Sequence, residues 1–150
     1  MKHLFEPAKA EEVRHRLERL QPDSQRQWGK MDSAQMLAHC NAAFAMAEGR
    51  IVSPRILIGR LLGPLAKKSM IINGEPMRRN SKTTPSVIIA DQSNFIVEKK
   101  RLRESIDGFV ARGPAICTKQ PHFFFGPLTP QEWAALMYQH LDHHLRQFGV

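Results

Sequence analysis

The sequence predicts an all-α protein, an antiparallel four-helix bundle with a short extra helical segment in the middle. Four segments repeat apolar residues every three to four positions, which is the spacing of a helix with one buried face. Turn residues separate these segments, and no convincing set of alternating strands accompanies them. The chain of 150 residues fits a single domain, residues 1–150, and is long enough to bury a real core.

The first two helices are expected in the first third of the chain. Pro7 suits a first helical position, and the segment after it keeps an apolar stripe to about Leu20. The second helix should begin near Asp32, an N-cap residue with Gln35 at the spacing of a capping box. It should extend to about residues 48–49.

The middle of the chain predicts less regular structure. Prolines and glycines interrupt the apolar residues 51–70, which indicates a short or broken helical segment. Residues 73–85 have the composition of a loop. Residues 87–90 have strand propensity but no partner run, so we expect an extended connection there.

Two further long helices are expected in the last third of the chain. A third long helix should start at Asp91 or Ser93 and end by the Gly-Pro pair at 113–114. The last helix has the firmest start, because Thr129 is an N-cap residue, Pro130 occupies the first helical position and a glutamate three residues after the cap completes a capping box.

Composition and charge narrow the function classes. The net charge of +8 favours anionic ligands, but the basic residues alternate with acids and no RNA-binding or helix-turn-helix pattern accompanies them. We therefore do not expect nucleic acid as the main partner. No apolar run approaches 18 residues and the N-terminus has no signal-peptide pattern, so we expect a cytoplasmic protein with no membrane partner.

Histidines gather near the end of the last predicted helix. His140 and His144 stand one turn apart and about 40° from each other around the axis, so their imidazoles can converge on one ion. His143 lies about 60° to the other side of His140, facing solvent or supporting the site, and Asp142 points elsewhere. Leu141 replaces the glutamate of a zinc-protease helix, which excludes that chemistry.

A third metal ligand has to come from another helix, and His39 in the second helix is the best candidate. The alternative for His39 is a core or helix-end histidine that binds nothing. Cys40 points about 100° away from it, as expected of a small buried residue. Cys40 and Cys117 lie far apart without a CxxC pairing, which indicates neither a disulfide framework nor a thiolate zinc site.

Two residues are candidate catalytic groups. Gln147, one turn beyond His144, can hydrogen-bond a ligand imidazole or bound water, and a surface position is its alternative. His122 precedes the last helix and can act as an acid or base because histidine titrates near neutral pH, and a loop position without a role is its alternative. Trp28 and Trp133 are expected first as core anchors and second as pocket walls.

Three segments carry a further pattern. They are residues 28–40 (WGKMDSAQMLAHC), residues 124–133 (FFGPLTPQEW) and residues 140–148 (HLDHHLRQF). In this order they resemble the DinB/YfiT-like superfamily of metal-binding four-helix bundles, and within it an uncharacterised bacterial branch. The resemblance covers most of the chain, is strong at the C-terminal motif and is weak through residues 50–90.

The resemblance implies a divalent metal ion held by one histidine of the second helix and two of the last, with an open face. By position these ligands are His39, His140 and His144, and the ion is zinc, nickel or a similar metal. It also implies a hydrolase or a thiol S-transferase. The small molecule on which it acts is unknown; the net charge favours an anionic one, and the resemblance to thiol-dependent transferases favours a low-molecular-weight thiol.

The alternative function is a non-catalytic basic bundle that binds nucleic acid or acts as a dimerising module. A homodimer is also consistent with the resemblance, since related bundles often pair through helix faces. The apolar residues 56–65 would supply such a surface, although a lid over the site explains them equally well.

Overall fold

The structure is a computed structural model, and it describes residues 1–81, 85–89 and 93–150. The described residues form helices and loops without a named strand, so the predicted all-α class is confirmed. The long helices are α1 (Pro7–Arg19), α2 (Ser33–Ala47), α3 (Leu57–Ala66), α4 (Phe95–Arg112) and α5 (Pro130–Gln147). The short ones are a π-helix, η1 (Lys67–Ile72), and two 3₁₀ turns, η2 (Pro85–Val87) and η3 (Gly113–Ile116).

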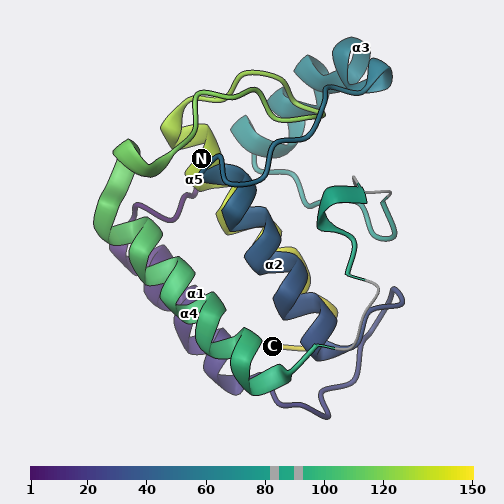
Figure 1. Cartoon of the computed structure of the whole chain (residues 1–150), viewed down its shortest axis with the longest axis vertical. Coiled ribbons are helices and arrows are strands. Elements are labelled where there is room, and N and C mark those ends of the chain that lie inside the picture. Colours follow the sequence, from purple (N-terminus) through teal and green to yellow (C-terminus); the bar gives the residue numbers. More distant parts are fainter. Residues whose placement is uncertain (82–84, 90–92) are drawn as a thin grey trace.

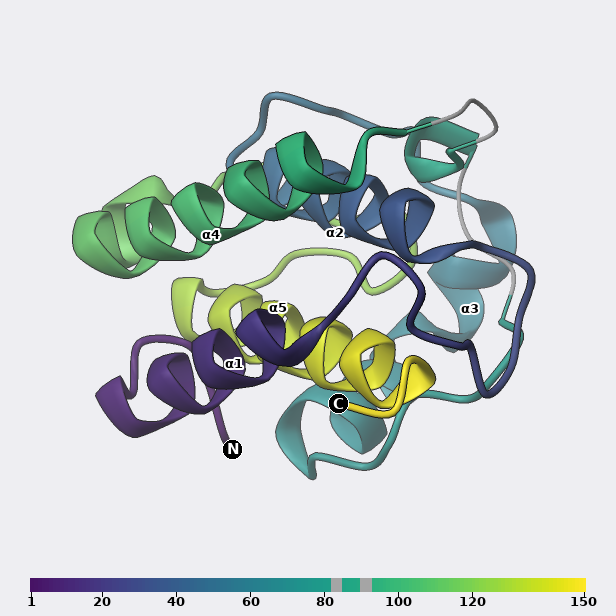
Figure 2. The same ribbon diagram turned by 90° about the horizontal axis from the view of Figure 1, so that it is seen from below.

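Four of the helices form a bundle of two layers. Figure 2 shows α2 and α4 in one layer and α1 and α5 in the other, with α3 to one side. Buried apolar side chains from all four helices meet between the layers in a continuous cluster that includes Phe44, Phe109 and Trp133. The two chain ends lie on the same side of the molecule as α1 and α5 (Figure 2).

Side-chain contacts give the relative directions of the bundle helices. Arg14 of α1 pairs with Asp107 of α4, and Glu18 pairs with Arg103, so these two helices are antiparallel. The start of α2 meets the end of α5, since the Gln27 amide donates to the Gln147 carbonyl, and this pair is also antiparallel. The pairs α1–α5 and α2–α4 run in the same direction, and the long crossover through α3 makes this topology possible.

The predicted helix starts are confirmed where the sequence supplies a capping box. Asp32 and Thr129 each accept a hydrogen bond from the backbone N–H three residues on. The side chains of Gln35 and Glu132 in turn accept one from the backbone N–H of Asp32 and Thr129. The start predicted for α4 was too early, because Asn94 is its N-cap, with its side chain accepting from the Val97 N–H.

The broken helical segment predicted for residues 51–70 is confirmed as α3 followed by the π-helical turn η1. The predicted extended connection at residues 87–90 is wrong at its first residue, because Val87 closes the η2 turn and is buried. Ala90 and Asp91, the other end of that connection and one of the two proposed starts of α4, lie outside the described residues.

Glycines determine how α3 sits on the rest of the molecule. Gly59 and Gly63 are the buried positions of α3 and face the backbone of Phe124 in the loop before α5. A Cβ atom on Gly59 would lie 2.8 Å from the Phe124 Cα, and one on Gly63 would overlap the Phe124 carbonyl. The backbone of α3 therefore contacts the loop directly at these two glycines, and the larger side chains of the helix point away from the loop.

Each helix among the described residues is too short or too polar to cross a lipid bilayer.

Candidate metal centre

Three histidines from two helices meet in the interior of the bundle. His39 lies in the second turn of α2, while His140 and His144 lie in the C-terminal half of α5, which runs beside α2 (Figure 1). One ring nitrogen from each histidine lies within 4.8 Å of the other two. His39 and His144 are buried and His140 is partly exposed. The structure thus brings together the three residues that the sequence singled out.

A backbone carbonyl fixes the tautomer of His39. Its Nδ1 lies 2.7 Å from the carbonyl oxygen of Val87 in the η2 turn. A carbonyl can only accept, so Nδ1 carries the proton and donates it. The lone pair of His39 is therefore on Nε2, the nitrogen that faces the other two histidines.

A glutamine fixes the tautomer of His144 in the same way. The Gln147 Nε2 donates to the Trp28 carbonyl at 2.8 Å, which turns the Gln147 Oε1 toward His144. That oxygen lies 2.8 Å from the His144 Nδ1, so Nδ1 is the protonated nitrogen. The hydrogen bond predicted between Gln147 and a histidine of the cluster is confirmed, and the lone pair of His144 is on Nε2.

His140 completes the cluster. Its Nε2 lies 3.0 Å from the Nε2 of His39, and its ring centroid lies 4.6 Å from that of His144. Since His39 has no proton on Nε2, the Nε2 of His140 donates in this contact. Moving that proton to the Nδ1 of His140 would turn the third Nε2 lone pair toward the same point.

Burial keeps all three imidazoles neutral. It lowers the pKa of His39, and it lowers the pKa of His144 to about 3. Burial and then the neighbouring His144 and His39 lower the pKa of His140 well below its ordinary value. Only the neutral imidazole has a lone pair for a metal, so all three histidines have the charge that a metal requires, and a change of tautomer at His140 would complete the donor set.

The donor set fits a divalent ion. Zinc binds imidazole nitrogen at 2.0–2.1 Å, so two tetrahedral ligands stand about 3.4 Å apart. The separations in the cluster bracket that value, from 3.0 Å between His39 and His140 to the limit of 4.8 Å. Metal-binding histidines usually donate their second N–H to a carbonyl or carboxylate, and here Val87 and Gln147 provide such acceptors.

A surface pocket of about 370 Å³ lies next to the cluster. Its lining includes Gln139, which precedes His140, and His143, which precedes His144, together with Trp28, Arg79 and Arg146. The His143 ring lies 5.0 Å from the His144 ring on one side and 5.5 Å from Trp28 on the other. His143 therefore lines the pocket, is partly exposed and contacts His144, which fits the prediction of a solvent-facing or supporting residue.

The first expectation for Trp28, that it anchors the core, is wrong. Trp28 is partly exposed in the pocket wall, and the Arg79 guanidinium lies 4.1 Å above its ring. Trp133 is buried in the core, as expected. Cys40 is fully buried, which raises the pKa of its thiol, and Asp142 pairs with Arg16 at 2.6 Å instead of joining the histidines.

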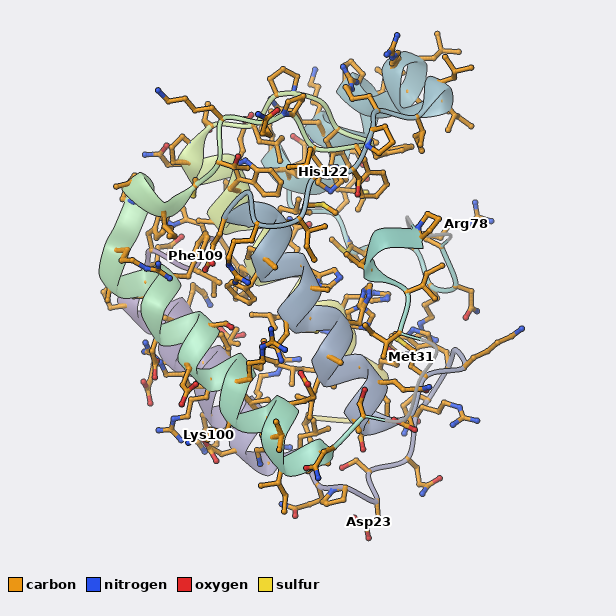
Figure 3. All side chains as sticks on the ribbon, in the orientation of Figure 1. Asp23, Met31, Arg78, Lys100, Phe109 and His122 are labelled. Atoms are coloured by element: carbon orange, nitrogen blue, oxygen red, sulfur yellow. The ribbon has the colours of Figure 1, made fainter. Side chains whose placement is uncertain are left out.

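His122 has a structural role that the sequence did not predict. It lies in the loop beneath α3, where Figure 3 labels it. Its Nδ1 accepts hydrogen bonds from the backbone N–H groups of Phe124 and Phe125, at 3.1 and 3.2 Å. Burial lowers the pKa of His122 to about 3. The acid–base role of His122 stays a prediction.

Sequence reasoning missed the two carbonyl groups that orient the cluster, those of Val87 and Trp28. Both belong to the backbone, so no residue type identifies them. The Arg79 side chain over Trp28 was also missed, because nothing in the sequence links residues that lie so far apart.

The lowered pKa of His122 predicts that the free energy of unfolding depends on pH. Its folded pKa of about 3 is below the ordinary value near 6.5, so the unfolded chain binds one more proton between these values. The contribution of neutral His122 to the free energy of unfolding is therefore fully present above pH 6.5 and is lost as the pH falls toward 3. We expect His122→Asn, whose Oδ1 can accept the same two bonds, to reduce the pH slope of the unfolding free energy. The reduction should approach 1.4 kcal/mol per pH unit near pH 5 in urea titrations. Equal slopes would contradict the neutral state of His122.

Comparison with known proteins places the chain in a family. No curated protein and no solved structure matches the chain. The family model described as a protein of unknown function (DUF1569) matches residues 4–149, which include the three histidines, Gln147 and the walls of the pocket from Trp28 to Arg146. The chain therefore belongs to the DUF1569 family.

Proposed function

We propose that the protein is a metal-dependent enzyme whose ion is held by His39, His140 and His144. The observation that carries this proposal is the fixed tautomer of two of the histidines. Val87 and Gln147 hold the Nδ1 protons of His39 and His144, so two buried lone pairs face the same point. A histidine that served only in packing would also need an acceptor for its N–H, but it would not need to turn its lone pair toward two other imidazoles.

The ion that we propose is divalent, with zinc or nickel as the leading candidates. Neutral imidazoles suit both metals, and three of them leave the full +2 charge on the ion. Such an ion is a Lewis acid that activates a nucleophile at neutral pH. Three protein ligands also leave a coordination position open, as in catalytic rather than structural sites. This donor set supports a hydrolase or a thiol S-transferase, in which the nucleophile is water or a thiol.

The pocket beside His143 is the proposed substrate site. Lys2, Arg79 and Arg146 line it together with the acids Glu75 and Asp142. Asp142 is already paired with Arg16 and Arg146, so Lys2 and Arg79 remain against Glu75, and this excess of one positive charge favours a small anionic molecule. In this proposal Trp28 provides a flat wall, and His143 joins the pocket to the metal centre through its contact with His144.

The sequence resemblance supports the same proposal. Residues 28–40 and 140–148 resemble the DinB/YfiT-like superfamily, whose members hold a divalent ion with histidines at these positions. Placing this DUF1569 protein in that superfamily is part of the proposal. The positions of His39 on α2 and of the other two histidines on α5 are those that the resemblance requires.

Metal content tests the site independently of the choice of substrate. Protein purified without a histidine tag and dialysed against zinc or nickel should keep about one equivalent, measured by mass spectrometry of the metal. His140→Ala/His144→Ala should abolish this binding because it removes two of the three ligands. His15→Ala on the exposed face of α1 is the matched control and should bind as the wild type does. Stoichiometric binding by the double variant would overturn the site.

The same proteins test catalysis. Metal-free and metal-loaded samples are assayed with a panel of anionic esters and amides, and with a thiol plus an electrophile. Turnover should require the ion and should be absent in the double variant, and the active panel identifies the nucleophile. An activity that survives removal of the metal would contradict a metal-dependent mechanism.

Gln147 should act as a positioning residue. Gln147→Ala removes the acceptor of the His144 N–H, so we expect the metal affinity to fall about 10- to 100-fold, measured by competition with a chelating dye. Gln131→Ala, at an exposed position of the same helix, should leave the affinity unchanged. An unaltered affinity in Gln147→Ala would show that the hydrogen bond does not support the metal.

A further inference from the structure

The helix α3 exposes an apolar face. Leu57, Leu61 and Leu65 are 81%, 77% and 70% exposed, and they follow one another at intervals of four residues on one side of the helix. Ile58 and Leu62, beside this stripe, are 57% and 43% exposed. A surface helix normally buries such residues against the core. An exposed apolar face of this kind therefore indicates a site of contact with another molecule or with a membrane.

The packing of α3 keeps this face outside. Its buried side consists of Gly59 and Gly63, which press against the Phe124 backbone. Rotating the helix to bury the leucines would drive branched side chains into that backbone. In Figure 1, α3 stands at a corner of the molecule, away from α1 and α4, so the four bundle helices do not cover it.

The charge around this face is mainly positive, although Arg50 pairs with Glu48 and Lys67 pairs with Glu132. Residues 49–74 contain five basic residues and no acidic one, and these basic residues are Arg50, Arg55, Arg60, Lys67 and Lys68. Arg60 lies on α3 itself and Lys68 lies in η1, the segment that continues from it, and both are exposed. Within the described ranges, neither of these two cations forms an ion pair with an acidic side chain.

We propose that α3 docks on an anionic lipid bilayer, with its leucines in the interfacial region and its cations at the headgroups. A short apolar helix flanked by Lys and Arg has the composition that lies in the plane of a membrane surface. Ten residues span about 15 Å, half of the hydrocarbon core, so α3 lies on the bilayer and does not cross it.

Charge favours lipid over a second copy of the chain as the occupant. A symmetric pair through α3 would bring two copies of the cations Arg60 and Lys68 together, and residues 49–74 contain no acid to neutralise them. Anionic headgroups neutralise those cations, while the acyl chains receive the leucines. The metal centre lies between α2 and α5, away from this face, so the proposal does not depend on the proposed function.

Sedimentation with lipid vesicles tests the proposal on the untagged, full-length protein. We expect binding to vesicles of equal parts phosphatidylglycerol and phosphatidylcholine, and little binding to phosphatidylcholine alone. The variant Leu57→Gln/Leu61→Gln/Leu65→Gln should weaken binding on the order of 100-fold, because it removes the apolar anchor. Ile96→Gln/Val97→Gln is the matched control, since these exposed apolar residues lie on α4, and it should bind like the wild type.

The cations are tested with two variants that carry the same net charge, two units below that of the wild type. Arg60→Gln/Lys68→Gln should weaken binding about 25-fold, at about fivefold for each charge. Lys100→Gln/Arg101→Gln removes two exposed charges from α4, where Figure 3 labels Lys100, and should have a much smaller effect. All replaced residues are exposed, so the variants should fold like the wild type, as circular dichroism will check.

Three results would overturn the proposal. The first is no sedimentation of the wild type with the anionic vesicles at low salt. The second is equal binding by the leucine variant and its α4 control. The third is a dimer in light scattering that the leucine variant converts to a monomer, because a second copy of the chain would then occupy the face.

Discussion

Two hydrogen bonds donated by imidazole Nδ1–H groups determine where the histidine cluster carries its lone pairs. A neutral imidazole carries one proton and one ring-nitrogen lone pair. When an acceptor holds the proton on Nδ1, the lone pair is on Nε2 and faces the neighbouring imidazole. Val87 holds the proton of His39, and Gln147, itself oriented by the Trp28 carbonyl, holds that of His144. The elements that carry these acceptors, the η2 turn, the end of α5 and the loop before α2, therefore belong to the site as much as the histidines do.

The bundle explains how such a site can be built from distant residues. The N-terminal half of α2 lies against the C-terminal half of α5 because the two helices are antiparallel, which brings His39 opposite the pair one turn apart on α5. The parallel pairing of α2 with α4 requires a long crossover, and that crossover includes both the η2 turn and α3. The same connection thus supplies a carbonyl to the metal centre and an apolar helix to the outside.

Much of this arrangement follows from local sequence patterns. The capping boxes at Asp32 and Thr129 predict the starts of two helices correctly, and helical spacing by itself separates His140 and His144 from His143. The contribution of His39 required a tertiary argument, supported by the resemblance. The remaining features have no local pattern. Backbone carbonyls carry no sequence label, and the wall position of Trp28 depends on the chain that packs over it.

The exposed leucines of α3 show the limit of hydrophobic pattern as a guide to burial. An apolar segment in the middle of a chain is expected in a core or an interface, and only the contact of its glycines with Phe124 shows which side faces outward. With both proposals, two parts of one small bundle carry separate functions. The metal centre lies inside, between α2 and α5, and α3 faces a membrane away from it, in contrast to the sequence-based expectation of no membrane partner.

X-ray absorption spectroscopy of the untagged, zinc-loaded protein tests the central claim most directly, because it reports the atoms bound to the ion. We predict a first shell of nitrogen and oxygen at about 2.0–2.1 Å, with the outer-shell scattering of three imidazoles. A sulfur shell at about 2.3 Å, or a spectrum with one imidazole or none, would contradict a site built from His39, His140 and His144.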